Sequence, residues 1–137
     1  NLSIRPTLTT EWDIRSIRSW VKNGSNQEIF TLLDARAEER FKGEFEPIDP
    51  KAGHIPGAIN RPFSKNLDKS GKFKCATKLK EEFISLLNDK YPTSVVHTCG
   101  SGISACHNLI AMESAGLIGS SLFVGSWSQW CNQIDDE

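Results

Sequence analysis

The stretch VVHTCGSGISACHNLIAMESAGL, residues 95–117, places three local signals in a row. A short continuous apolar run ending at His97–Thr98 is typical of a strand that is buried on both faces. A cysteine and two glycines follow, and apolar residues then recur at helical spacing up to Gly116. The stretch therefore predicts a strand, a glycine-containing turn and a helix, with Cys99 at the point where the strand ends.

The rest of the chain continues this alternation. A helix is predicted after residue 10, with Thr9 or Thr10 as its N-cap and Asn23–Gly24 at its end. The further predicted elements are a strand in EIFTLLDAR (28–36), a short strand in AINRPF (58–63), a helix over 76–91, a strand in SLFVGS (121–126) and a helix in WSQWCNQI (127–134). Such alternation predicts an α/β fold, with a central, mainly parallel sheet flanked by helices on both faces.

Composition limits the possible partners. The 137 residues include 16 basic and 17 acidic side chains, without a basic stripe or a long apolar run. We therefore expect one domain over residues 1–137 that binds neither nucleic acid nor a membrane. The four cysteines form no CxxC pair, so we expect reduced thiols in the cytoplasm, and no ligand spacing indicates a metal or a cofactor.

Cys99 is the candidate nucleophile. The turn of Gly100, Ser101 and Gly102, followed by Ile103 and Ser104, allows several backbone N–H groups to converge at the start of a helix. Cysteines at helix N-termini titrate at roughly 3.5–7.5 instead of about 8.5, because the N–H groups and the helix dipole stabilise the thiolate. The alternative is a small buried cysteine before an ordinary glycine turn.

Phosphatase activity is a less favoured interpretation of the loop after Cys99. Cysteine phosphatases bind phosphate with an arginine six residues after the cysteine, since its guanidinium forms two parallel hydrogen bonds. Here Ala105 stands at that position, and no arginine occurs between Cys99 and Glu137.

Four motifs together resemble the rhodanese superfamily of sulfurtransferases. They are LLDARAEERFKG (32–43), GHIPGAINRPF (53–63), CGSGISA (99–105) and FVGSWSQW (123–130), and they occur in the order of that family. More narrowly, the chain is similar to the C-terminal catalytic module of the 3-mercaptopyruvate sulfurtransferases. The first residue is Asn1 and the sole methionine is Met112. We therefore expect the chain to be the C-terminal half of a two-module protein, preceded by another rhodanese-like module.

The resemblance implies roles for particular residues. Cys99 would take sulfur from a small donor and carry it as a persulfide to a thiol acceptor, such as thioredoxin or a low-molecular-weight thiol, or to cyanide. The backbone from Gly100 to Ser104 would cradle the anion, Ser101 would donate a hydrogen bond, and Arg40 would bind the donor carboxylate. The neutral residues Gly100 and Ser101 favour 3-mercaptopyruvate over thiosulfate, whose users have basic residues there.

One departure from the family concerns the donor site. The mercaptopyruvate branch has a second arginine in a Glu-Pro-Arg stretch, but this chain reads Glu46-Pro47-Ile48. Lys42 or Lys51 would have to compensate for it. The alternative for Arg40 itself is a surface ion pair with a nearby glutamate, for which Glu38, Glu39 and Glu44 are the candidates.

Other notable residues are predicted to be structural. Asp34, Arg36 and His54 are expected to fix loops, His97 to support the sheet, Cys106 to be a packed thiol, and Trp127 and Trp130 to lie in the core. Two functional classes remain as alternatives to the sulfurtransferase. One is a rhodanese-like binding or regulatory module without catalysis, and the other is the cysteine phosphatase.

Overall fold

Four short strands form one parallel sheet in the part of the chain that the computed structural model describes, which is residues 10–26, 30–100 and 103–133. Their order is β2-β1-β3-β4, and every neighbouring pair is parallel. The strands are β1 (Thr31–Asp34), β2 (Ile59–Asn60), β3 (Val95–Thr98) and β4 (Ser121–Leu122). The predicted α/β class and the parallel sheet are confirmed.

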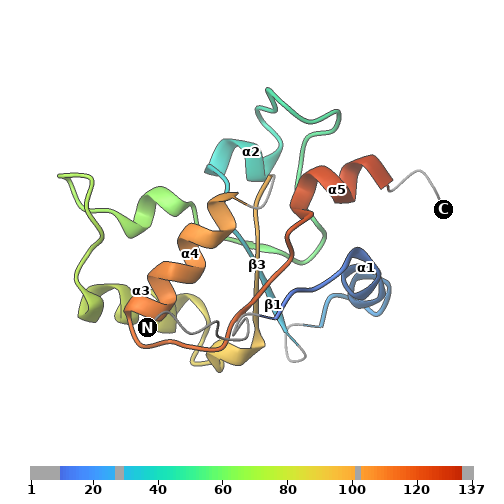
Figure 1. Ribbon diagram of the computed structural model, residues 1–137. Helices are drawn as coiled ribbons and strands as arrows, with labels where there is room; N and C mark the ends of the chain where they lie inside the picture. The colour runs from blue at the N-terminus through green and yellow to red at the C-terminus, as the bar shows by residue number, and fades with distance from the viewer. Residues whose placement is uncertain (1–9, 27–29, 101–102, 134–137) are drawn as a thin grey trace, which may run out of the picture.

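The helices cover both faces of this sheet. They are α1 (Ile14–Lys22), α2 (Glu38–Lys42), α3 (Ala76–Leu86), α4 (Ile103–Ser114) and α5 (Ser126–Gln133), with the short 3-10 helices η1 (Phe63–Asn66) and η2 (Pro92–Ser94). Figure 1 shows α1 and α5 on one side of the sheet and α3 and α4 on the other. Helix α2 lies beyond the carboxyl ends of the strands (Figure 1). The two layers of helices are those predicted from the alternation of elements.

Alternation along the strands divides the core in two. Leu32 and Val96, paired across β1 and β3, pack with Ile17 of α1 and with Trp127 and Trp130 of α5. The neighbouring residues Leu33 and Val95 point to the other face, where they meet Leu79 and Phe83 of α3 and Met112 of α4. Successive side chains of a strand point to opposite faces, so two adjacent apolar residues supply both cores.

The start of α1 differs from the prediction. Asp13, not Thr9 or Thr10, is its N-cap, and the carboxylate of Asp13 accepts a hydrogen bond of 3.0 Å from the Ser16 N–H. Thr9 lies outside the described residues. Asp13 is favoured because its short carboxylate reaches the otherwise unpaired N–H groups of the first turn. The end of α4 agrees with the prediction, since Gly116 has a positive φ of 83° just beyond it. The predicted helix over 76–91 is shorter than expected, because α3 ends at Leu86 and Asn88 and Asp89 adopt left-handed conformations with φ of 50° and 61°.

The loop between α2 and β2, residues 43–58, is fixed at several points. The guanidinium of Arg36 donates to the Gly53 carbonyl at 2.7 Å, and the indole N–H of Trp127 donates to the Lys51 carbonyl at 2.9 Å. The His54 ring stacks on Phe41, and its Nδ1 lies 2.8 Å from the Phe41 carbonyl. These contacts hold the loop near α2 and α5, beyond the carboxyl ends of the strands (Figure 1).

Within residues 10–26, 30–100 and 103–133, no helix has both the length and the apolar character that crossing a bilayer requires.

Candidate active site

Cys99 follows β3 directly, at the carboxyl edge of the parallel sheet, where ligands of open α/β sheets bind. Its side chain is buried and packs with Ala35, Ala105 and Leu122. Cys106, one turn into α4, packs against the same group. The thiol is therefore held in an apolar setting at the end of a strand, next to the start of a helix.

Ser126 holds the backbone of Cys99 in place. The Cys99 N–H donates to the Ser126 hydroxyl oxygen at 3.0 Å, and that oxygen lies 4.0 Å from the Cys99 sulfur. The same hydroxyl donates to the Phe123 carbonyl at 2.9 Å. Ser126 thus lies between the end of β4 and the nucleophile.

The first residues of α5 also bind the segment around Cys99. The Trp127 N–H donates to the Cys99 carbonyl at 2.8 Å, and the Ser128 N–H donates to the Gly100 carbonyl at 2.9 Å. These N–H groups have no partner within their own helix, because they belong to its first turn. The start of α5 therefore fixes the backbone on which the thiol is carried.

Arg40 of α2 lies against Gly100. A side-chain β-carbon built on Gly100 would be 3.2 Å from one terminal nitrogen of Arg40 and 3.5 Å from the other. The guanidinium binds the carboxylate of Glu46 at 3.1 Å and approaches that of Asp49 at 3.5 Å. Arg40 therefore pairs with acids of the loop beyond its own helix, and not with Glu38, Glu39 or Glu44 as considered from the sequence.

Glu46 is a buried carboxylate with several donors. It accepts hydrogen bonds from the N–H groups of Ile48 and Asp49 at 3.1 and 3.0 Å, besides the bond from Arg40. Burial opposes ionisation of this group, but the two backbone donors and Arg40 together lower the pKa of Glu46 below its ordinary value. Glu46 is therefore an ionised anchor for the loop.

Asp34 and Arg36 form a buried ion pair at the end of β1. Arg36 donates to both carboxylate oxygens of Asp34, with a shortest distance of 2.8 Å, and its guanidinium carbon lies 5.2 Å from the ring centre of Trp127. One Arg36 nitrogen also lies 3.6 Å from Glu46. Together with the bond to Gly53, these contacts agree with the loop-fixing role predicted for both residues.

His97 lies inside the sheet and not in the site. Its Nε2 is 3.1 Å from the Ser120 hydroxyl, and the ring is fully buried. Burial lowers the pKa of His97 to about 3, since the charged imidazolium would lose its hydration. His97 is thus a neutral residue of the sheet at ordinary pH, in agreement with the predicted supporting role.

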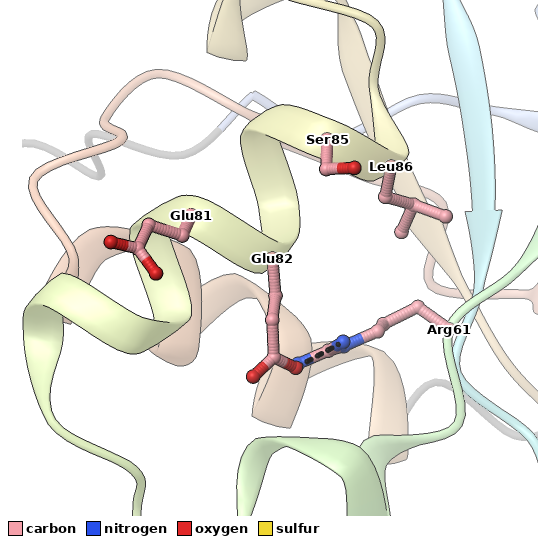
Figure 2. Close-up of a pocket in the computed structure, with 5 residues that line it drawn as sticks. All are labelled: Arg61, Glu81, Glu82, Ser85 and Leu86. Atoms are coloured by element: carbon pink, nitrogen blue, oxygen red, sulfur yellow. Dashed lines mark hydrogen bonds and ion pairs between the residues drawn. The ribbon is translucent and has the colours of Figure 1, made fainter.

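A surface pocket of about 370 Å³ lies between α3 and the segment after β2. Figure 2 shows Arg61 pointing from that segment to Glu82 of α3, while Glu81 points away from it. The donors of Arg61 are bound to Asn66, Glu82 and the Lys65 carbonyl at 2.9–3.1 Å. Because its nitrogens already bind groups of the chain itself, we assign Arg61 a structural role, in which it joins α3 to the segment after β2.

Residues 18–133 match the family model described as the rhodanese-like domain. The chain belongs to this family. The family resemblance predicted from the four motifs is thereby confirmed.

Similar proteins of this rhodanese-like family are sulfurtransferases by name. Over 104 residues, the chain is 50% identical to a probable 3-mercaptopyruvate sulfurtransferase from Pseudomonas aeruginosa, covering 76% of this chain and 37% of that protein. It is 45% identical over 103 residues to a putative thiosulfate sulfurtransferase from Mycobacterium tuberculosis, covering 73% and 34%. The chain thus spans little more than a third of the length of these relatives.

The solved structures include similar rhodanese-like proteins. The Tum1 protein from Saccharomyces cerevisiae superposes with a TM-score of 0.76 at 26% identity, over 90% of this chain and 44% of that one. A 3-mercaptopyruvate sulfurtransferase from Leishmania major superposes with a TM-score of 0.65 at 29% identity, over 77% of this chain and 30% of that one.

The rhodanese-like fold brings some of the predicted site residues together. Cys99, Gly100 and Arg40 meet at one edge of the sheet, and Ile103 and Ser104 begin α4. Ser101 and Gly102 lie outside the described residues. Neither Ser126 nor Asp49 was predicted from the sequence, and Glu46 was noted only as part of the stretch that contains Ile48. A signal for Ser126 was present in the Gly-Ser-Trp stretch at 125–127, whereas the two acids resembled ordinary loop residues.

Proposed function

We propose that this rhodanese-like chain is a sulfurtransferase module in which Cys99 carries sulfur as a persulfide. The observation that supports this most directly is the position of Cys99, between the end of β3 and the start of α4, with the Ser126 hydroxyl 4.0 Å from its sulfur. N–H groups at the start of a helix favour an anion there. The names of the relatives support sulfur transfer as the reaction class.

The proposed reaction has two steps. The Cys99 thiolate attacks the transferable sulfur of 3-mercaptopyruvate, a bond forms between the two sulfurs, and the carbon–sulfur bond breaks. Its electron pair leaves with the pyruvate enolate, which then takes up a proton. In the second step, an acceptor thiolate attacks the outer sulfur of the persulfide, and the bonding pair returns to Cys99 as its thiolate.

Arg40 is the proposed anchor for the donor carboxylate. Its guanidinium adjoins Gly100, so an anion bound there would lie close to the nucleophile. The backbone from Gly100 to Ser104 is the proposed cradle for negative charge, and Ser101 is the proposed hydrogen-bond donor. A neutral Gly100 suits 3-mercaptopyruvate better than the doubly charged thiosulfate, since it adds no positive charge to balance the second one.

The proposed partners follow from this chemistry. A thiol, either of thioredoxin or of a small molecule, is the proposed acceptor, and the cytoplasm is the proposed compartment because its thiols stay reduced. A preceding rhodanese-like module is proposed to complete the donor site.

The deciding test is a comparison of the wild-type chain with Cys99→Ser. After treatment with 3-mercaptopyruvate, we expect intact-mass analysis of the wild type to show an addition equal to one sulfur atom, removable by a reducing agent, and cyanide to yield thiocyanate. Cys99→Ser should show neither, whereas Cys75→Ser, which removes an exposed thiol, should behave as the wild type does. Equal sulfur transfer by Cys99→Ser would refute the assignment.

A binding or regulatory module is the second candidate, and the engagement of Arg40 by Glu46 and Asp49 favours it. Both acids belong to this chain and already neutralise the proposed anchor. A wild-type chain that takes up no sulfur from either 3-mercaptopyruvate or thiosulfate would support this candidate. Hydrolysis of an aryl phosphate would support the phosphatase instead.

A further inference from the structure

Five ionisable side chains form a connected group beside Gly100. They are Asp34, Arg36, Arg40, Glu46 and Asp49, joined by contacts of 2.8–3.6 Å. With all of them ionised, this group carries one more negative than positive charge. The proposed anchor for an anionic donor therefore lies in surroundings that are not positive overall, so the negative members of the group influence which anions bind there.

The two acids that face Arg40 are held differently. The Glu46 carboxylate accepts two backbone N–H bonds, lies 3.1 Å from Arg40, and is 3.6 Å from Arg36. The Asp49 carboxylate is more distant from Arg40, at 3.5 Å. Its shorter hydrogen bond, of 2.7 Å, is accepted from the Ser128 hydroxyl. Glu46 is thus bound firmly into the loop, whereas Asp49 is the weaker partner of Arg40.

Asp49 is also linked to the backbone that follows the nucleophile. Ser128, whose hydroxyl donates to Asp49, uses its own N–H to bind the Gly100 carbonyl at 2.9 Å. Asp49 therefore contacts both sides of the site, Arg40 from α2 and Ser128 from α5. Its side chain is only 6% exposed, so water screens its charge poorly.

The charge of Asp49 reaches beyond its direct contacts. Burial is the main cause that raises the pKa of the Cys131 thiol in α5, and the negative charges of Asp49 and Glu46 raise that pKa further. Of the two lysines considered as compensating charges, Lys42 and Lys51, the first pairs with Glu38 at 2.8 Å. Ile48, at the position of the family's second arginine, adds no positive charge and is 75% exposed.

We propose that Asp49 sets the charge preference of this site, so that singly charged donors are accepted and doubly charged donors are disfavoured. The proposal rests on the proposed sulfurtransferase function. Asp49 and an incoming anion compete for the same nitrogen of Arg40, and the repulsion between Asp49 and a dianion is about twice that for a monoanion at the same position. 3-Mercaptopyruvate carries one negative charge near neutral pH, and thiosulfate carries two.

The test compares Asp49→Asn with the wild type. Asparagine has nearly the same shape, retains an acceptor for Ser128 and removes the charge. We expect the ratio of kcat/KM for thiosulfate to that for 3-mercaptopyruvate, measured as persulfide formation on Cys99, to rise by about three- to tenfold. Asp49→Ser removes the same charge and should change the ratio in the same direction, which covers the case in which asparagine disturbs folding.

Glu38→Gln is the matched control. It removes one negative charge from the same neighbourhood of the chain, but its side chain is 57% exposed and paired with Lys42. We expect this variant to leave the donor ratio unchanged. A ratio that rises equally in Glu38→Gln would point to net charge alone, and an unchanged ratio in both Asp49 variants would overturn the proposal.

A binding measurement separates this proposal from the sulfurtransferase function. Dissociation constants for sulfate and pyruvate, obtained from amide chemical shifts of the isotope-labelled chain, require no sulfur transfer. In Asp49→Asn we expect sulfate binding to tighten several-fold more than pyruvate binding. If the wild type transfers no sulfur but this difference appears, the proposed reaction fails and the charge selection stands. If the two anions tighten equally, the charge selection fails whatever the activity.

Discussion

Ser126 combines an unusual backbone conformation with a buried hydroxyl. Its φ of 55° lies in the left-handed region, which few residues other than glycine adopt without strain. A serine is nevertheless present, because its hydroxyl accepts the Cys99 N–H and donates to the Phe123 carbonyl. These hydrogen bonds thus offset the backbone strain at Ser126 and fix the position of Cys99.

Substitution of Ser126 should lower the free energy of unfolding. In Ser126→Ala, the buried N–H of Cys99 loses its partner, which costs about 1–3 kcal/mol. Ser126→Gly loses the same hydroxyl but relaxes the left-handed conformation, so we expect a smaller loss than for alanine. Urea unfolding of the two variants and the wild type measures both differences, and an alanine variant as stable as the wild type would contradict the role assigned to this hydroxyl.

At the scale of elements, α3 is joined to the segment after β2 by Glu82, whose carboxylate lies 2.9 Å from Arg61 (Figure 2). The same carboxylate lies 3.1 Å from Lys74. Burial opposes ionisation of Glu82, but these two cations lower its pKa below the ordinary value. Arg61 itself is nearly buried and also lies over the Phe83 ring, with 4.7 Å between the guanidinium carbon and the ring centre.

Glu82→Gln should destabilise the fold, since it leaves the buried Arg61 without its negative partner. We expect a loss of about 1–3 kcal/mol in the free energy of unfolding. Glu81→Gln is the matched control, because the adjacent Glu81 is exposed and points away from Arg61 (Figure 2). Chemical denaturation of both variants provides the comparison. Equal decreases in the free energy of unfolding for both variants would show that the contact between Glu82 and Arg61 does not stabilise the fold.

Much of this arrangement of elements was predictable from the sequence. The continuous apolar residues of β1 and β3, and the glycine-rich turn after Cys99, are local signals that depend little on the rest of the fold. The N-cap of α1 was misassigned, since several polar residues precede that helix and only geometry distinguishes Asp13 from the threonines. Local signals therefore identify elements better than they identify the ends of elements.

The site was predictable only in part, because its contacts join distant segments. Arg40 was considered with glutamates within four residues of it, whereas its partners belong to the following loop and include Asp49, nine residues away. Ser126 reaches Cys99 across 27 positions of the chain. Such pairs depend on where the strands end in space, and no spacing within the sequence specifies them.

At the scale of the whole molecule, the buried His97 couples stability to pH. Its folded pKa of about 3 lies far below the ordinary value of 6.5, so the unfolded chain binds a proton that the folded chain excludes. Stability is therefore retained above about pH 6.5 and is lost progressively as the pH falls toward 3. The carboxylates Glu46 and Glu82, whose folded pKa values lie below the ordinary value of 4.5, add to the loss of stability only as the pH falls below about 4.5.

Between pH 6.5 and 5 we expect the free energy of unfolding to fall, with a contribution from His97 that steepens toward about 1.4 kcal/mol per pH unit at pH 5. His97→Gln retains a hydrogen-bonding group for Ser120 but does not titrate, so this contribution should disappear. Urea titrations at both pH values test the difference. A variant with the same pH dependence as the wild type would show that His97 is not the group responsible.

The contact between Gly100 and Arg40 also constrains how this domain can change during evolution. Any side chain at position 100 would bring its first carbon within 3.2 Å of the guanidinium, so the arginine would have to shift. A basic residue introduced there to attract another donor would therefore require a small movement of the existing anchor. The two positions are expected to show epistasis, and directed evolution toward a new donor should recover paired substitutions more readily than single ones.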